Sequence, residues 1–170
     1  MGMKKILQKE EKVLRHIAQE IPIREIKTTR IKKIIKEMSL ALASQNDGVA
    51  LAAPQIGYSM RIFVVSNKIF PAESKENSVP KDLIFINPKI SKLSREKIWV
   101  PEGCLSVRPL YGKTFRSTKA TITAYDENGQ KFIRGASGLL AQIFQHETDH
   151  LNGILFIDHA KDIKAEVPQK

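Results

Sequence analysis

Apolar residues recur every three or four positions between residues 29 and 43, and lysines occupy much of the opposite side. The apolar positions are Ile31, Ile34, Ile35, Met38 and Leu42. This spacing predicts an amphipathic helix that packs one face on the core and exposes the other to solvent. Thr28 or Thr29 can cap its start, because a threonine hydroxyl accepts a hydrogen bond from the first free backbone N–H groups.

A second helical pattern covers residues 138–152, with Ser137 as the expected N-cap and Gly153 as the expected end. The residues that share one face at positions i, i+4, i+7 and i+11 are Leu139, Ile143, His146 and His150. Because this face mixes aliphatic residues with two histidines, the pattern predicts a helix that lies inside the protein.

Short apolar runs bounded by turn-forming residues predict β-strands elsewhere in the chain. They cover residues 61–66, 83–87, 97–100, 119–125 and 131–134, and the last two form a hairpin. An N-terminal amphipathic helix, short antiparallel or mixed strands and a buried C-terminal helix indicate an α+β fold. We expect one domain over residues 1–170, with a polar, frayed tail from about residue 160.

Composition narrows the class of protein. Hydrophobic residues make up 42% and charged residues 27% of the 170 residues, which is typical of a globular protein and argues against a disordered one. No signal peptide is visible, and no apolar run reaches the ~20 residues of a transmembrane helix. The one cysteine excludes an intramolecular disulfide and suits a reducing compartment. We therefore expect a cytoplasmic protein, or an organellar one if a targeting segment has been removed.

The most informative chemical pattern is the HETDH sequence at residues 146–150. On a helix, His146 and His150 project to the same side, where both imidazoles can reach one metal ion. Glu147 then lies beside the ion without binding it and can handle the proton of a bound water. The alternative is a pair of core histidines with a surface glutamate, although histidines on a buried face need polar partners.

A catalytic metal site of this kind needs a third protein ligand. Asp158 and His159 are the nearest downstream candidates, and Phe156 stands where the longer HExxHxxGxxH motif has its last histidine. Upstream lies Cys104, in the sequence EGCLS. A lone cysteine is often a small core residue. A thiolate with two imidazoles would instead leave a fourth position open for water, as in catalytic rather than structural sites.

Three motifs, in order along the chain, resemble those of the peptide deformylase family. They are GVALAAPQ at 48–55, EGCLS at 102–106 and QHETDHLNG at 145–153, which look like the family patterns GxGxAAxQ, EGCLS and QHExDHLxG. Residues 6–15 also look like the N-terminal segment of the family. An HExxH pattern alone is weak, whereas three motifs in the right order and at the right separations are specific.

The resemblance implies a metal-dependent hydrolase that removes the N-formyl group from the formyl-methionine of newly made polypeptides and releases formate. It implies that Cys104, His146 and His150 bind one divalent ion. The family generally uses Fe²⁺, and Zn²⁺, Ni²⁺ or Co²⁺ are alternatives for a mixed Cys/His site. It also implies that Glu147 takes a proton from the attacking water and delivers it to the leaving amine.

Further roles follow from the same resemblance. The Gln55 side-chain amide and the Leu105 backbone N–H would donate hydrogen bonds to the oxyanion. Apolar residues near the motifs would form the methionine pocket, and backbone groups would bind the peptide as an added strand. This substrate-binding set is Gly48, Val49, Ala50, Val100, Gly103, Leu139 and Ile143. Its apolar members could equally be core residues. Glu102 and Arg116 match a family ion pair that braces the strand before Cys104.

Three positions depart from the family pattern. Ala50 replaces a glycine, which is tolerated only if the backbone φ angle is negative there. Tyr111 stands where some members carry a substrate-contacting arginine, so contacts beyond methionine can differ. Gln142 replaces an arginine or aliphatic residue on the metal-facing side of the helix and changes the polarity of the pocket. None of the three removes a metal ligand or the general base, so we expect an active enzyme.

Two other functions compete with this interpretation. An HExxH endoprotease would take its third ligand downstream of His150. A nucleic-acid-binding module would use the basic N-terminal part, where residues 1–40 hold eleven Lys and Arg against five Glu. A solvated helix face explains that charge equally well, and aromatics are only 6%, too few for base stacking. We expect no DNA or membrane partner; the basic surface could favour the ribosome, where formylated chains emerge.

Overall fold

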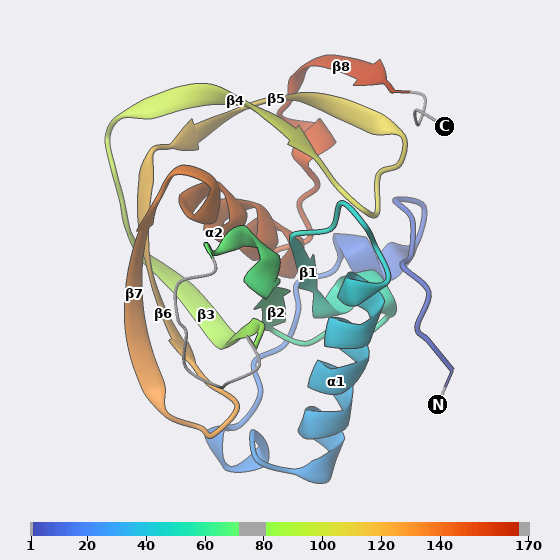
Figure 1. Ribbon diagram of the computed structural model, residues 1–170, viewed down its shortest axis with the longest axis vertical. Helices are drawn as coiled ribbons and strands as arrows, with labels where there is room; N and C mark the ends of the chain where they lie inside the picture. Colours follow the sequence, from blue (N-terminus) through green and yellow to red (C-terminus); the bar gives the residue numbers. More distant parts are fainter. Residues whose placement is uncertain (1, 72–80, 167–170) are drawn as a thin grey trace.

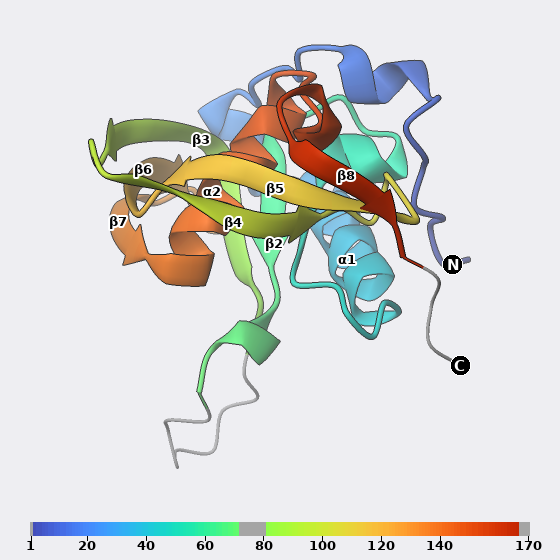
Figure 2. The same ribbon diagram turned by 90° about the horizontal axis from the view of Figure 1, so that it is seen from above.

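The computed structural model describes residues 2–71 and 81–166, in which two antiparallel β-sheets enclose a helix (Figures 1 and 2). The strands are β1 (Ala50–Ala52), β2 (Ile62–Val65), β3 (Leu83–Leu93), β4 (Lys97–Gly103), β5 (Leu110–Ser117), β6 (Lys119–Tyr125), β7 (Lys131–Ser137) and β8 (Lys161–Ala165). The α-helices are α1 (Thr29–Ala43) and α2 (Gly138–Leu151). Within this described part, no helix is long and apolar enough to cross a membrane.

The first sheet has five strands in the order β1-β2-β3-β6-β7, and it is covered on both faces. Side chains alternate between the two faces of a strand. On β2, Ile62 and Val64 therefore pack with α1, whereas Phe63 and Val65 pack with α2. This arrangement explains why all four residues of β2 are buried.

Helix α1 forms where the apolar spacing predicts it. The Thr28 hydroxyl accepts a hydrogen bond from the Ile31 N–H at 3.4 Å, so Thr28 is the cap. Four of the five predicted core positions are buried, and Ile35 is half-buried. The lysines of the opposite face point to solvent.

Helix α2 lies between the five-stranded sheet and the second sheet, which has the order β4-β5-β8 (Figure 1). Its apolar side joins an aromatic cluster in which Phe144 lies 5.3 Å from Phe85 and 6.3 Å from Phe63, measured between ring centroids. Ser137 stands at the N-cap position, but its side chain makes no capping hydrogen bond, so the expected serine cap is wrong.

The second sheet is where the sequence-based expectations were incomplete. β4 extends to Gly103 rather than ending at Val100, and β5 was not expected at all. The buried positions of β5 include Gly112, Thr114 and Arg116, so this strand lacks the apolar alternation that marks a strand in a sequence. The expected frayed tail is wrong over Lys161–Ala165, which forms β8 and pairs with β5, and residues 167–170 lie outside the described part of the chain.

Gly153 joins the N-terminal segment to the end of α2. Its φ angle is +74°, a conformation that favours glycine, and a Cβ there would lie 2.5 Å from the carbonyl oxygen of Arg15. Close by, the Ala18 N–H donates to the Leu151 carbonyl at 2.9 Å. The glycine of the last sequence motif is therefore required by packing as well as by its backbone conformation.

We expect Gly153→Ala to lower the free energy of unfolding by about 3–4 kcal/mol, since it adds a steric clash to the ~1–2 kcal/mol cost of a left-handed backbone. Gly129→Ala is the matched control: its φ is +78°, but nothing lies within 4 Å of an added Cβ. The control should lose only about 1–2 kcal/mol. Urea denaturation measures both values, and equal losses would contradict the role of the Arg15 contact.

Candidate active site

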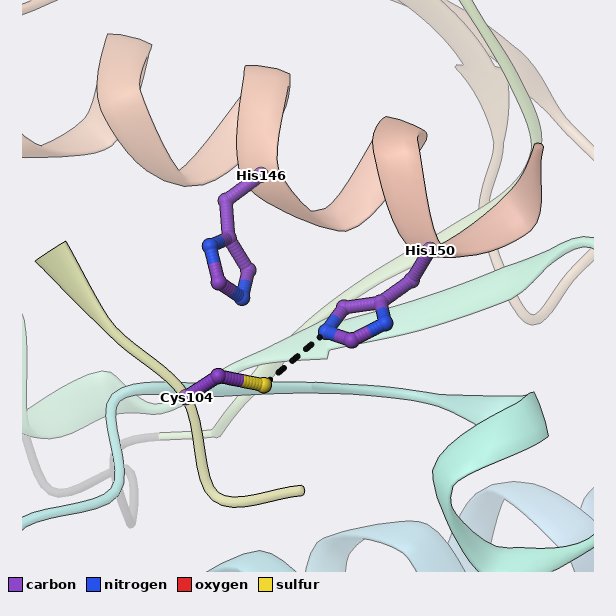
Figure 3. A group of neighbouring side chains, drawn as sticks. All are labelled: Cys104, His146 and His150. Atoms are coloured by element: carbon purple, nitrogen blue, oxygen red, sulfur yellow. Dashed lines mark hydrogen bonds between the residues drawn. The ribbon is translucent and has the colours of Figure 1, made fainter. Parts of the chain in front are cut away.

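Cys104, His146 and His150 converge at the edge of α2. Their ligand atoms all lie within 4.8 Å of one another, and Cys104 Sγ is 3.2 Å from His150 Nε2 (Figure 3). Both histidines come from α2, one turn apart, with ring centroids separated by 4.9 Å. Cys104 comes from the loop after β4, on the opposite side of the cluster. The two histidines that share one face of the helix and the upstream cysteine thus lie together.

The downstream candidates for a third ligand are engaged elsewhere. Asp158 forms a bidentate ion pair with Arg15, with N–O distances of 2.6 and 3.0 Å. His159 Nε2 lies 3.5 Å from the carboxylate of Asp149. Among residues 2–71 and 81–166, no other group of three His, Cys, Asp or Glu side chains is spaced to hold a metal ion. This geometry favours Cys104 over the ligand set of an HExxH endoprotease.

Glu102 orients the first histidine of the cluster. Its Oε2 lies 3.0 Å from His146 Nδ1, so a proton on Nδ1 leaves Nε2 free to bind a metal. Arg116 donates to both Glu102 oxygens at 2.7 and 3.1 Å, which confirms the expected ion pair. Burial alone would raise the pKa of Glu102, but its hydrogen bonds with His146 and Arg116 outweigh burial and hold that pKa well below the usual range.

Glu147 is buried directly beside the cluster, with 3% of its surface exposed. Burial, reinforced by the negative charges of Glu102 and Asp149, raises its pKa to about 7, although the charge of His146 opposes the shift. Its Oε2 has no hydrogen-bond partner among the described residues. A carboxyl group with a pKa near neutrality and a free oxygen is suited to accept and release a proton.

The side chains fit a divalent metal ion. Cys and His are the donors that zinc and the first-row transition metals prefer, and three such ligands leave room for a water. Burial, followed by the charge of His146, holds the pKa of His150 well below its usual value, so this imidazole is neutral and able to bind a metal. The buried Oε2 of Glu147 is without a hydrogen-bond partner in the described part of the chain, as expected for a group that serves the water of a bound ion.

Gln55 is held at the cluster by both ends of its amide. Its Oε1 accepts a hydrogen bond from the Ala52 N–H at 2.8 Å. Its Nε2 donates to the Ser106 hydroxyl at 3.0 Å and lies 3.6 Å from Cys104 Sγ. The side chain is almost fully buried, so its amide N–H groups have a fixed direction toward the site.

A cavity of about 230 Å³ opens beside the cluster. The predicted site residues that line it are Gly48, Val49, Ala50, Gln55, Gly103, Cys104, Leu105, Leu139, Ile143, His146 and Glu147. His150 belongs to the cluster behind the cavity wall. Val100 is not part of the wall, because the cavity reaches only the last residues of β4, from Pro101 to Gly103. Val100 therefore stays a predicted substrate-binding residue that the structure does not place at this cavity wall.

Two departures from the family pattern gain a structural explanation. Ala50 lies in β1 with a negative φ angle, so its methyl group fits there without backbone strain. Gln142 lies at the cavity and donates from Nε2 to the Pro101 carbonyl at 2.8 Å and to Glu102 at 3.1 Å. Its amide thus joins α2 to β4 instead of only adding polarity to the pocket.

Sequence reasoning missed an ion pair at the cavity. Arg108 forms two hydrogen bonds to Asp47, at 2.7 and 2.8 Å, and a third to the Tyr111 hydroxyl at 3.0 Å. All three residues line the cavity. Arg108 and Asp47 are 61 positions apart and lie in loops, so no periodicity or local motif signals that they meet.

Comparison with known proteins agrees with the geometry. Residues 3–166 match the family model described as "Polypeptide deformylase". The peptide deformylase of Carboxydothermus hydrogenoformans is 40% identical over 164 residues, which cover 96% of this chain and 97% of the relative. That of Borreliella burgdorferi is 41% identical over 133 residues, which cover 78% of this chain and 74% of the relative.

Solved structures show the same fold. The peptide deformylase of Thermotoga maritima superposes with a TM-score of 0.81 at 31% identity, covering 95% of this chain and 99% of the other. A class I type b peptide deformylase from Acinetobacter baumannii, bound to Met-Ala-Ser, superposes with a TM-score of 0.82 at 29% identity, covering 94% and 100%. With a family model that matches nearly the whole chain and relatives at about 40% identity, the chain belongs to the polypeptide deformylase family.

Proposed function

We propose that Cys104, His146 and His150 hold one divalent metal ion and that Glu147 moves the proton in the reaction of this peptide deformylase. The enzyme removes the N-formyl group from newly made polypeptides. The observation that carries the assignment is the convergence of the three ligand atoms within 4.8 Å, next to a buried glutamate with a free oxygen. When bound, the ion supplies a Lewis acid and lowers the pKa of water toward ~7.

The chain's own residues carry the remaining steps. Glu147 accepts the proton of the water that attacks the formyl carbon, and its pKa of about 7 lets it return that proton to the leaving amine nitrogen. As charge develops on the formyl oxygen, the Gln55 amide and the Leu105 backbone N–H donate hydrogen bonds to it. Because Gln55 is anchored through Oε1, the position of its amide group is set before the substrate binds. Formate and a free N-terminus leave.

The substrate peptide binds between two edge strands. β1 is at one end of the five-stranded sheet and β4 is at one end of the three-stranded sheet, and both contribute to the cavity wall. Backbone groups of residues 48–50 and Gly103 can therefore add an extended peptide as a strand. Val49, Leu139 and Ile143 form the apolar surface for the methionine side chain. Val49 and Leu139 are 37% and 51% exposed, as expected of apolar residues that form a binding surface.

We propose Fe²⁺ as the native ion, bound in one catalytic domain that comprises residues 1–170 and acts in the cytoplasm. The family resemblance supports iron, and the thiolate and imidazole donors suit it. The single cysteine is consistent with a reducing compartment. Protein purified anaerobically should contain about one iron per chain by plasma emission spectrometry, and zinc in its place would overturn the assignment of iron alone.

Glu147→Gln should lower kcat for formate release from formyl-Met-Ala by about 10²–10⁴-fold, because glutamine cannot accept the proton. The variant should still bind a full complement of metal, since Glu147 is not a ligand. Glu10→Gln, in the exposed N-terminal segment, is the control and should keep wild-type activity. Retained turnover in Glu147→Gln would exclude Glu147 as the general base.

Cys104→Ala should remove a ligand and lower the metal content from about one ion per chain to a small fraction. Loading the wild-type protein with Co²⁺ should give a sulfur-to-cobalt charge-transfer absorption that the variant lacks, even in excess Co²⁺. Circular dichroism checks that the variant folds. If the variant keeps both its metal and its activity, the third ligand is not Cys104.

We also propose that the basic face of α1 brings the enzyme to ribosomal RNA. The exposed cations of this region include Lys27, Arg30, Lys32, Lys33 and Lys36. Only Lys33 among them has an ion-pair partner in the described residues, the Glu37 carboxylate at 4.0 Å. Such a surface binds phosphates in a salt-dependent way.

The affinity of the enzyme for ribosomes, measured by co-sedimentation, should fall at least tenfold when the salt concentration rises from 50 to 200 mM. The triple variant Arg30→Glu, Lys32→Glu, Lys36→Glu should abolish co-sedimentation. An equal charge change on the five-stranded sheet, Lys92→Glu, Lys119→Glu, Lys131→Glu, should leave more binding. Absence of sedimentation at low salt, or an equal loss in both triple variants, would remove this proposal.

A further inference from the structure

An ion pair joins the two walls of the cavity at its mouth. Asp47 lies in the loop between α1 and β1, and Arg108 lies in the loop between β4 and β5. The guanidinium donates to both carboxylate oxygens, at 2.7 and 2.8 Å. This bidentate geometry fixes the orientation of the two groups relative to each other. Tyr111 supports the guanidinium with its hydroxyl at 3.0 Å.

The two loops also touch directly beneath this pair. A Cβ on Gly48, the residue after Asp47, would lie 3.3 Å from the side chain of Leu105 and 3.0 Å from that of Leu42. Close backbone approach at Gly48 therefore lets the two walls meet. The ion pair lies at the edge of this contact and lines the cavity together with the residues assigned to the peptide.

Both charges remain accessible to whatever enters the cavity. The Arg108 side chain is 37% exposed and that of Asp47 is 59% exposed. The hydrogen bond from Arg108 lowers the pKa of Asp47, so the carboxylate is ionised at neutral pH. An exposed pair of this kind contributes little to stability. Each charge alone would attract or repel a neighbouring charged group, so the loss of one partner changes the field at the cavity more than it changes the fold.

We infer that Asp47 and Arg108 are specificity-determining residues for the part of the substrate that follows formyl-methionine. Each charge cancels the field of the other at the cavity mouth, so the enzyme accepts acidic and basic downstream residues alike. This inference rests on the proposed function of the site. It explains how one cavity can process new polypeptides whose second and third residues differ in charge, without preferring one sign.

The test compares two substrates, amidated formyl-Met-Asp-Asp and amidated formyl-Met-Lys-Lys, with amidated formyl-Met-Ala-Ala as the neutral reference. In Asp47→Asn the unpaired arginine should raise the ratio of kcat/KM for the acidic over the basic substrate by about three- to tenfold relative to wild type. In Arg108→Gln the unpaired aspartate should lower this ratio by a similar factor. The double variant should return the ratio to the wild-type value, and 0.5 M salt should weaken both shifts.

A second bidentate pair, Arg15–Asp158, provides the matched control. Its side chains are 44% and 37% exposed, and neither residue lines the cavity. Arg15→Gln and Asp158→Asn make the same changes in net charge and should leave the ratio unchanged.

The neutral substrate distinguishes failure of the proposed function from failure of the proposed role of the Asp47–Arg108 pair. If wild-type enzyme releases no formate from it, the proposed function fails. If it does release formate, and the two single variants shift the charge ratio in the same direction or not at all, the role of the pair is overturned. A double variant that keeps either single-variant preference would also overturn it, because mutual cancellation requires the two effects to offset each other.

Discussion

The buried carboxylate of Glu102 is the group on which the geometry of the metal site depends. It is 6% exposed and receives hydrogen bonds from Arg116, Thr114 and Gln142, in addition to its contact with His146. A charge buried without partners is costly, and loss of one partner from a buried pair costs ~3–5 kcal/mol. The carboxylate therefore fixes β4, β5 and α2 relative to one another, and the orientation of His146 follows from their common contact.

This constraint explains why the enzyme needs two sheets. The five-stranded sheet supplies an apolar face against which α2 packs through Phe144 and Leu151. The three-stranded sheet supplies polar inner residues, including Glu102 and Arg116, that face the same helix. Cys104 follows directly after β4, so the strand that carries Glu102 also places the thiol. The metal site thus forms where an apolar support and a polar support meet on opposite sides of one helix.

The contrast between the apolar and the polar sheet also explains which features the sequence predicts. Helix α1 follows from helical periodicity, whereas the full ligand set and the Glu102–Arg116 pair were expected from the resemblance to the family. Strand β5 was not, because its inward positions serve the polar network and carry Gly, Thr and Arg where apolar residues would mark a strand. The contact of Asp47 with Arg108 is set by two loops meeting in space, which no local pattern records.

Two arginine–carboxylate pairs therefore act in opposite ways because their burial differs. Arg116 and Glu102 are shielded from water, so their attraction is strong, their geometry is fixed and neither can change alone. Arg108 and Asp47 are open to water and bind each other with little net stabilisation. Residues at the cavity mouth can thus be substituted without disturbing the fold, while the buried pair keeps His146 in the orientation that the chemistry needs. Separation of the two roles allows one fold to keep its reaction and still adjust what it accepts.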